Sequence, residues 1–292
     1  MTRSFALLVN PVAAGGRALK HLPAVLGEFE RLGAAHRSVE TRSVEHACEE
    51  ARAAADAGET VTTLGGDGFV RPIAAELAGG RGVLAILPGG RGNDLARVLG
   101  IPPEPEAAVG VAVEGRERPI DLAEVNGTPY LGIASLGFDS DANRIANEAK
   151  LVRGQLVYLY AALRALAGWK PATFSVTVDG ERHEVTGWSV AVANSKAYGG
   201  GMFIAPQAEL DDGKLDVVTI SQCSKLRFLR ELPTVFKGTH LNNPRVTTLR
   251  GEEITVEADR PFEVYADGDP LARTPATMRV RPGALRVIVP KD

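Results

Sequence analysis

Apolar runs that end in glycine-rich loops are the feature of this sequence that most restricts its fold. Glycine inside a regular element costs about 0.5–1 kcal/mol relative to alanine, so several glycines after a strand indicate a tight turn or a close approach of another group to the backbone. Three such pairs of strand and loop occur in the first hundred residues: Phe5–Val9 before NPVAAGG (10–16), Val61–Leu64 before GGDG (65–68), and Gly82–Leu87 before PGGRGND (88–94).

Stretches with helical spacing alternate with these runs. A fourth strand is predicted at His36–Glu40, and Ser43 is placed to cap the helix that follows it. The predicted helices are Arg17–Leu32, Ser43–Ala57, Asp67–Leu77 and Asn93–Leu99. Alternation of strand and helix predicts a doubly wound α/β domain with a parallel sheet, which we place at residues 1–120.

The pattern changes near residue 120, where short extended runs replace the alternation. One long helix, about Ala142–Ala167, interrupts these runs, and Asp179-Gly180 is typical of a hairpin turn. The predicted strands are Pro119–Val125, Tyr130–Ser135, Thr173–Asp179, Glu181–Ala193, Leu215–Ile220, Glu252–Ala258, Phe262–Ala266 and Leu285–Val289. They predict a second, β-rich domain at residues 121–292, arranged as a sandwich, with the ligand site in the cleft between the domains.

The glycine loops are suited to phosphate. Loops at the carboxyl ends of parallel strands face the ligand crevice, and the second and third loops each open a helix, whose first N–H groups attract anions. Asp67 cannot bind phosphate directly, but with Asp94 it can hold a divalent cation that bridges to phosphate oxygens. Each loop alone is equally well interpreted as a helix cap or tight turn; three together favour the phosphate interpretation.

Composition excludes several classes of protein. A net charge of −3 over 292 residues gives no general attraction to nucleic acid. The two cysteines, Cys48 and Cys223, are far apart and suit a reducing compartment. The apolar run at the start is short and broken by Asn10-Pro11, unlike a signal peptide, and no apolar run approaches the roughly 20 residues of a membrane span. We therefore expect a cytoplasmic protein, with peripheral association at the inner membrane face left open.

One stretch departs from the overall charge. Residues 225–250 contain six Lys or Arg residues and one Glu, together with Leu226, Phe228 and Leu229. Two interpretations remain open: a surface that meets anionic lipid, or a solvated basic face.

Over nearly its whole length the chain resembles the diacylglycerol kinase and sphingosine kinase family of lipid kinases, in particular its compact bacterial members. The matching stretches are NPVAAGG (10–16), Thr41, GGDGF (65–69), PGGRGND (88–94), VANSKAYGGGMFIAPQAELDDGKLDVV (192–218) and DGD (267–269). GGDG is shared with NAD kinases, whereas the stretch at 192–218 is more specific. The resemblance implies an N-terminal phosphofructokinase-like domain, a C-terminal β-sandwich, and ATP in the cleft.

The resemblance also implies roles for particular residues. Asp67 and Asp94 would belong to a magnesium network, and Asp269 would be the general base. A second, structural magnesium loop would take a side-chain ligand from Asp212 and carbonyl ligands from Glu209 and Lys214. The nucleotide site would comprise Asn10, Pro11, Thr41, Gly65, Gly66, Asp67, Gly68, Arg91, Asn93 and Asp94.

Three positions depart from the family pattern. Phe69 and Arg91 stand where the family has threonines, and Asp269 stands where it has glutamate. Two hydroxyl contacts to phosphate are thereby lost, although the guanidinium of Arg91 can bind phosphate oxygens in a bidentate way. Asp269 keeps the carboxylate but has a shorter reach.

The leading hypothesis is an ATP- and magnesium-dependent kinase that phosphorylates a primary hydroxyl of a diacylglycerol-like lipid at a membrane surface. A catalytically weak lipid- or nucleotide-binding protein of the same fold is the alternative from another class, and an NAD kinase relative is the rival within the kinases. No nucleic-acid partner is expected, and a homodimer is left open.

Overall fold

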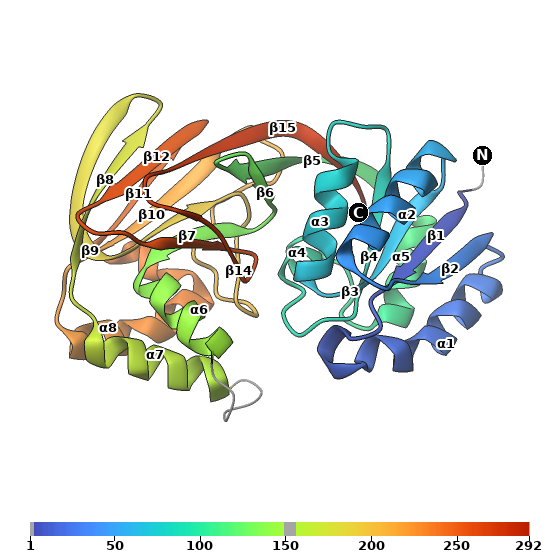
Figure 1. The fold of residues 1–292 in the computed structure, drawn as a ribbon, viewed down its shortest axis with the longest axis horizontal. Helices are drawn as coiled ribbons and strands as arrows, with labels where there is room; N and C mark the ends of the chain where they lie inside the picture. Colours follow the sequence, from blue (N-terminus) through green and yellow to red (C-terminus); the bar gives the residue numbers. More distant parts are fainter. Residues whose placement is uncertain (1–2, 149–155, 292) are drawn as a thin grey trace.

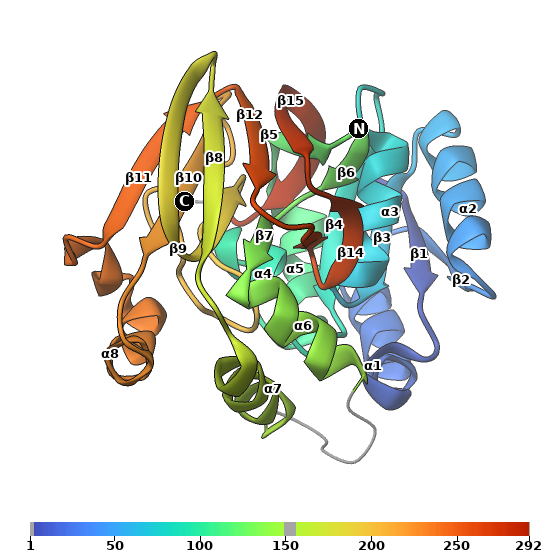
Figure 2. The ribbon, with the colours of Figure 1, turned by 60° about the vertical axis from the view of Figure 1, so that its left-hand side comes forward.

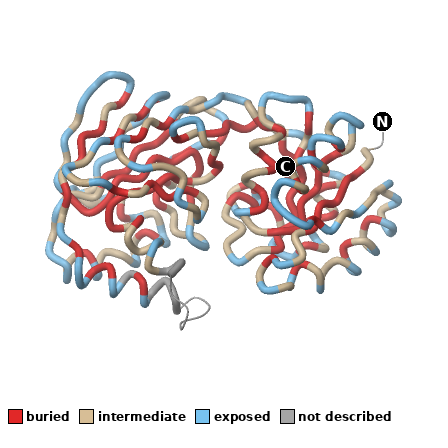
Figure 3. The backbone as a smooth tube through the Cα atoms, in the orientation of Figure 1, coloured by how far each residue is buried: buried red, intermediate tan, exposed pale blue. Residues whose placement is uncertain are grey.

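The computed structural model describes residues 3–148 and 156–291, which form two lobes joined by long strands (Figure 1). In both lobes the strands are largely buried and the exposed residues lie mainly on helices and loops (Figure 3). No helix among the described residues is long and apolar enough to cross a membrane.

A parallel sheet forms the centre of the first lobe. Its strands are β1 (Phe5–Val9), β2 (His36–Glu40), β3 (Thr60–Gly65) and β4 (Val83–Pro88), in the order β2-β1-β3-β4. The helices are α1 (Arg17–Arg31), α2 (Val44–Asp56), α3 (Asp67–Leu77), α4 (Asp94–Val98) and α5 (Pro105–Glu114), with a 3₁₀ turn η1 (Ala13–Gly15). Helices α2 and α3 pack against each other, and α1 packs against α5, as on the two faces of a doubly wound sheet. The predicted α/β class is confirmed.

The second lobe is β-rich, as predicted, and its strands pair in antiparallel fashion. They are β5 (Arg116–Val125), β6 (Thr128–Tyr130), β7 (Ile133–Gly137), β8 (Ala172–Val178), β9 (Glu181–Ala193), β10 (Leu215–Ser221), β11 (Val246–Gly251), β12 (Glu253–Ala258), β13 (Glu263–Ala266), β14 (Asp269–Arg273) and β15 (Ala276–Val289). The first half of β9 pairs with β8. The second half of β9 lies between two strands and pairs with both β7 and β10. The sheet therefore divides at β9 into layers that enclose the lobe's aromatic core of Phe138, Trp188 and Phe228.

The helical part of the second lobe differs from the prediction. One helix was expected at 142–167; the structure has α6 (Phe138–Glu148) and α7 (Leu156–Gly168), and the segment between them lies outside the described residues. Helix α6 begins four residues early because Asp139 and Asp141 favour a first helical turn. The remaining elements are α8 (Lys225–Glu231), η2 (Leu232–Lys237) and η3 (Thr239–Asn242).

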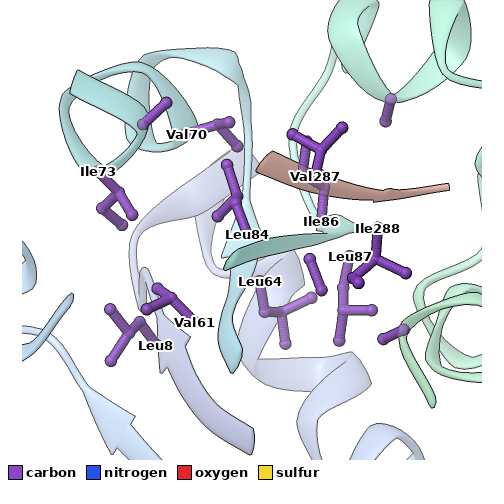
Figure 4. Packing of buried hydrophobic residues seen from close by; sticks show 14 of the residues in the cluster. Leu8, Val61, Leu64, Val70, Ile73, Leu84, Ile86, Leu87, Val287 and Ile288 are labelled. Atoms are coloured by element: carbon purple, nitrogen blue, oxygen red, sulfur yellow. The ribbon is translucent and has the colours of Figure 1, made fainter. Parts of the chain in front are cut away.

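Two long strands connect the lobes. Strand β15 pairs with β12 at its start and runs into the first lobe, where Arg286 and Val287 pair in parallel with β4. Strand β5 lies antiparallel beside β15 along this path. Figure 4 shows Val287 and Ile288 packed among core residues of the first lobe. The last strand of the chain is thus part of the first lobe's core, and the predicted division at residue 120 stays a prediction.

Candidate active site

The carboxyl ends of β1, β2, β3 and β4 meet at one edge of the parallel sheet, as the strand order requires. Asn10 follows β1, and its Oδ1 accepts the N–H of Val12, so this side chain shapes its own turn. Thr41 follows β2 and is buried, with its Oγ1 donating to the carbonyl of Val9. Both predicted nucleotide residues lie at the expected edge, but their polar groups also stabilise the loops. Pro11 lies beside Asn10 in the same turn.

The second and third glycine loops lie directly against each other. Gly89 N–H donates to Gly65 O at 2.7 Å. A Cβ added to Gly90 would come within 2.4 Å of Gly66 Cα, and one added to Gly89 within 3.0 Å of Gly65 N. These glycines are therefore needed for loop-to-loop packing. By contrast, a Cβ on Gly68 would meet no heavy atom within 4 Å, so the backbone there faces open space.

Two predicted metal residues converge between these loops. A Cβ on Gly92 would lie 3.0 Å from Asp67 Oδ2 and 3.2 Å from Asp94 Oδ2, so both carboxylates border the same small space. Burial raises the pKa of Asp94, and the negative charge of Asp67 raises it further, although the N–H of Gly200 opposes this. The opposing lobe supplies that N–H, which lies 3.0 Å from Asp94 Oδ1. Two carboxylates that border one small space, with the charge of Asp67 adding to the rise in the pKa of Asp94, fit a divalent cation.

A third carboxylate, which the sequence did not single out, approaches from the second lobe. Asp267 lies in the β13–β14 turn, with φ +52° followed by Gly268 at φ +91°. Its two oxygens accept the N–H groups of Leu131 and Gly132 at 2.7 and 2.9 Å. Burial raises the pKa of Asp267 to about 6, against these hydrogen bonds, and Asp67 adds to the rise. The first Asp of the DGD stretch was the only sequence signal for it.

The predicted general base, Asp269, is half exposed at the start of β14 and forms an ion pair. Arg71 Nη2, from α3 of the first lobe, lies 2.8 Å from Asp269 Oδ2. The Nε of the same guanidinium is buried and has no hydrogen-bond partner among the described residues. The positive charge of Arg71 also opposes, to a small extent, the rise in the pKa of Asp267. The DGD turn of the second lobe and α3 of the first lobe thus meet through the guanidinium of Arg71, which the sequence analysis did not single out.

Two residues of the third loop have different roles. Asn93 adopts φ +52°, and its Oδ1 accepts the N–H of Gly90, so it closes the loop on itself. Arg91 is exposed and has no hydrogen bond or ion pair among the described residues. Phe69, which stands where the family has threonine, is buried, and its ring fills the space beside Gly65.

The predicted structural magnesium loop, Glu209–Lys214, is already paired with a positively charged side chain, that of Arg250. In this turn Asp212 Oδ1 accepts the N–H of Lys214, and Asp212 Oδ2 is paired with Arg250. The Lys214 ammonium extends to Glu252, and Glu209 lies close enough to raise the pKa of Asp216. No group of three or more His, Cys, Asp or Glu side chains is arranged for a metal ion within the described ranges. Because the guanidinium occupies Asp212, this turn does not fit a metal as it stands.

The chain matches two family models and many relatives. Residues 4–125 match "Diacylglycerol kinase catalytic domain", and residues 132–289 match "YegS C-terminal NAD kinase beta sandwich-like domain". A diacylglycerol kinase of Mycobacterium tuberculosis (strain ATCC 25618 / H37Rv) is 36% identical, covering 97% of this chain and 94% of the relative. A "probable lipid kinase YegS-like" protein of Pseudomonas aeruginosa (strain UCBPP-PA14) is 34% identical, covering 97% and 93%.

A solved structure agrees on the fold. The crystal structure of a diacylglycerol kinase from Bacillus anthracis str. Sterne superposes with a TM-score of 0.78 at 23% identity, covering 99% of this chain and 97% of that one. With both halves of the sequence matched in order by the two family models, the chain belongs to the diacylglycerol kinase and YegS-like family of lipid kinases.

Proposed function

We propose that this protein is an ATP- and magnesium-dependent kinase that phosphorylates a primary hydroxyl of a diacylglycerol-like lipid. The observation that carries the proposal is the convergence of Asp67 and Asp94 beside Gly92, at the edge of the sheet where the glycine loops open. Phosphoryl transfer needs positioning and electrostatic stabilisation more than covalent chemistry by the protein.

The residues of the first lobe divide this work. The backbone at Gly68 is open to a phosphate group, and Arg91 in the neighbouring loop has an exposed guanidinium with no hydrogen bond or ion pair among the described residues. Asp67 and Asp94 would hold magnesium, which when bound neutralises charge on the phosphate oxygens. The N–H of Gly200, in the second lobe, donates to Asp94. This hydrogen bond positions the proposed metal residues relative to the lobe that would bind the lipid.

Asp269 is the proposed base. Its Oδ2 is held by Arg71, which leaves Oδ1 to take the proton of the lipid hydroxyl. As this proton is transferred, the hydroxyl oxygen of the lipid attacks the γ-phosphorus of ATP and ADP leaves. Asp267 does not share this role, because both of its oxygens accept backbone N–H groups. It orients the turn that carries Asp269.

Two observations favour the alternative of a catalytically weak binding protein. The proposed base, Asp269, is already paired with Arg71. In addition, the buried Phe69 stands at a position where the family pattern has a threonine hydroxyl. If the charge of Arg71 holds Asp269 too weakly basic to take the proton of the hydroxyl, ATP binds without turnover.

Transfer of labelled phosphate from [γ-³²P]ATP to diacylglycerol in mixed micelles, with and without magnesium, tests the proposal. We expect labelled phosphatidic acid only with magnesium. Phosphorylation of NAD but of no lipid would contradict the proposal, and ATP binding with no transfer to any lipid would establish the binding protein instead.

A further inference from the structure

The segment formed by α8 and η2 (residues 225–237) has apolar side chains on both of its faces. Phe228 and Val235 are buried against the second lobe. Leu226, Leu229 and Phe236 point outward and are 79%, 36% and 54% exposed. Single exposed apolar residues are common on protein surfaces, but these three lie together in one short segment in which Phe228 and Val235 are buried.

A cavity lies directly beneath this segment. Its wall on one side is made by Phe228, Leu232 and Val235, the inner residues of the same segment, and on the other by strand residues that include Ala191 and Val218. The segment therefore separates an apolar cavity from the outside by the thickness of one helix.

Three polar side chains line the same cavity. Tyr198 and Ser189 hydrogen-bond to Asp139, and burial raises the pKa of Asp139 to about 6. Tyr198 precedes Gly200, whose N–H holds Asp94 of the candidate active site. Tyr198 is also near enough to Asp94 for that carboxylate to raise its pKa, so the polar side of the cavity lies toward the candidate active site, and its apolar wall lies under α8 and η2.

The outer face of the segment is positively charged. Residues 225–237 contain four cations and one acid, in a protein whose net charge is −3. The acid, Glu231, is already bound by Arg227 and Asn243. Arg230 and Lys237 are exposed and have no hydrogen bond or ion pair among the described residues. Figures 1 and 2 show α8 at the outer edge of the lobe next to α7, where Lys225 Nζ donates to Ala167 O.

We propose that α8 and η2 form the surface with which this protein rests on an anionic lipid bilayer, with Leu226, Leu229 and Phe236 entering the interface and Arg230 and Lys237 meeting acidic headgroups. Apolar residues flanked by cations on one helical face are the pattern of an interfacial segment. The inference deepens the proposed function, on which it rests: docking at this segment brings the candidate active site to the bilayer that holds its lipid substrate.

Co-sedimentation of the full chain with vesicles tests the proposal. The vesicles are phosphatidylcholine alone or an equimolar mixture with phosphatidylglycerol, at low and high salt. Two variants remove one contribution each, Leu226→Ser/Phe236→Ser and Arg230→Glu/Lys237→Glu. The matched control is Arg42→Glu/Val44→Ser, which changes an exposed cation and an exposed apolar residue in the first lobe.

The wild-type protein should bind the anionic vesicles, and each test variant should bind at least about tenfold more weakly, because the apolar and ionic contributions act together. The control variant should bind like wild type. Absence of wild-type binding at low salt, or unchanged binding in both variants, overturns the proposal. So does a wild-type dimer that the Leu226→Ser/Phe236→Ser change converts to monomer while vesicle binding persists, since the face would then belong to a second copy of the chain.

A short-chain, water-soluble diacylglycerol separates this proposal from the proposed function. Both variants should phosphorylate it at the wild-type rate and lose activity only on vesicles. Vesicle binding without phosphorylation of any lipid would contradict the proposed function and leave the docking surface intact, whereas activity on the soluble lipid without vesicle binding would do the reverse.

Discussion

Arg71 and Asp269 join the two lobes by an ion pair, with Arg71 Nη2 2.8 Å from Asp269 Oδ2. The residues are 198 positions apart in sequence, one in α3 and the other at the start of β14. Their side chains are 17% and 51% exposed, so the pair is worth under about 1 kcal/mol to stability. Its importance is therefore positional: it fixes which oxygen of the proposed base remains available.

Asp269→Asn should lower turnover by about 10²–10⁴, the usual contribution of a general base, and leave ATP affinity near wild type. Asp269→Glu should retain activity because it keeps a carboxylate. Arg71→Gln should lower turnover on its own but add little in the Asp269→Asn background, since both changes act on one carboxylate. Steady-state kinetics of wild type and the four variants measures this, and fully additive losses would show that Arg71 acts elsewhere.

Asp67→Asn should reduce turnover sharply and raise the magnesium concentration needed for half-maximal rate. The reason is that Asp67 and Asp94 border one small space, and removing one charge leaves a weaker cation site. The measurement is a magnesium titration of the initial rate. If the variant keeps the wild-type rate and magnesium dependence, Asp67 serves only the turn, where its Oδ1 accepts the N–H of Leu95.

Arg91→Ala should weaken ATP binding by about 1.5–3 kcal/mol, the range for a hydrogen bond to a charged group. The side chain is exposed at the loop edge and has no partner among the described residues, so its removal should not change stability. Calorimetric titration with ATP measures the affinity, and Arg42→Ala in the first lobe is a matched control. Equal affinity in wild type and Arg91→Ala would exclude the phosphate role.

Much of the first lobe was predictable, because its strands end in glycine loops whose spacing reflects a parallel sheet. Helix α5 was missed: Pro105 at its start was a usable signal, but its alanine-rich sequence lacks strong periodicity. Strands β11 and β14 were missed because both are half exposed. The ion pairs of Arg71 and Arg250 could not be predicted from local sequence patterns, because their partners are distant in sequence and only the fold brings them together.

The pH dependence of stability should reveal the buried state of Asp267. Its pKa is raised to about 6 by burial, so its contribution to stability is fully present below its ordinary value near 3.8 and is lost as pH rises through about 6. Compared with wild type, Asp267→Asn should therefore lose less stability between pH 4 and pH 7, measured by urea unfolding.

Asp179 provides a control of opposite sign. It accepts the N–H groups of Glu252 and Glu253, and these hydrogen bonds hold its pKa below the ordinary value. Its contribution is present above that value and is lost as pH falls through the lower folded one, so Asp179→Asn should flatten only the acidic end of the profile. A wild-type slope in Asp267→Asn between pH 4 and pH 7 would contradict the assignment to Asp267.

Arg250→Met should show whether the Glu209–Lys214 turn can hold magnesium. In wild type the guanidinium of Arg250 faces Asp212 and lies 3.8 Å from Asp216 Oδ2, and burial raises the pKa of Asp216. Removing the cation leaves two carboxylates close together, so the variant should melt at a lower temperature than wild type.

Magnesium should restore part of this loss if a metal can take the place of the guanidinium, and it should do so less in Arg250→Met/Asp212→Ala. Thermal unfolding with and without magnesium makes the comparison, and calcium tests whether the site is selective. Equal magnesium-induced shifts in wild type, Arg250→Met and the double variant would show that this turn is held by its ion pair and has no role in binding metal.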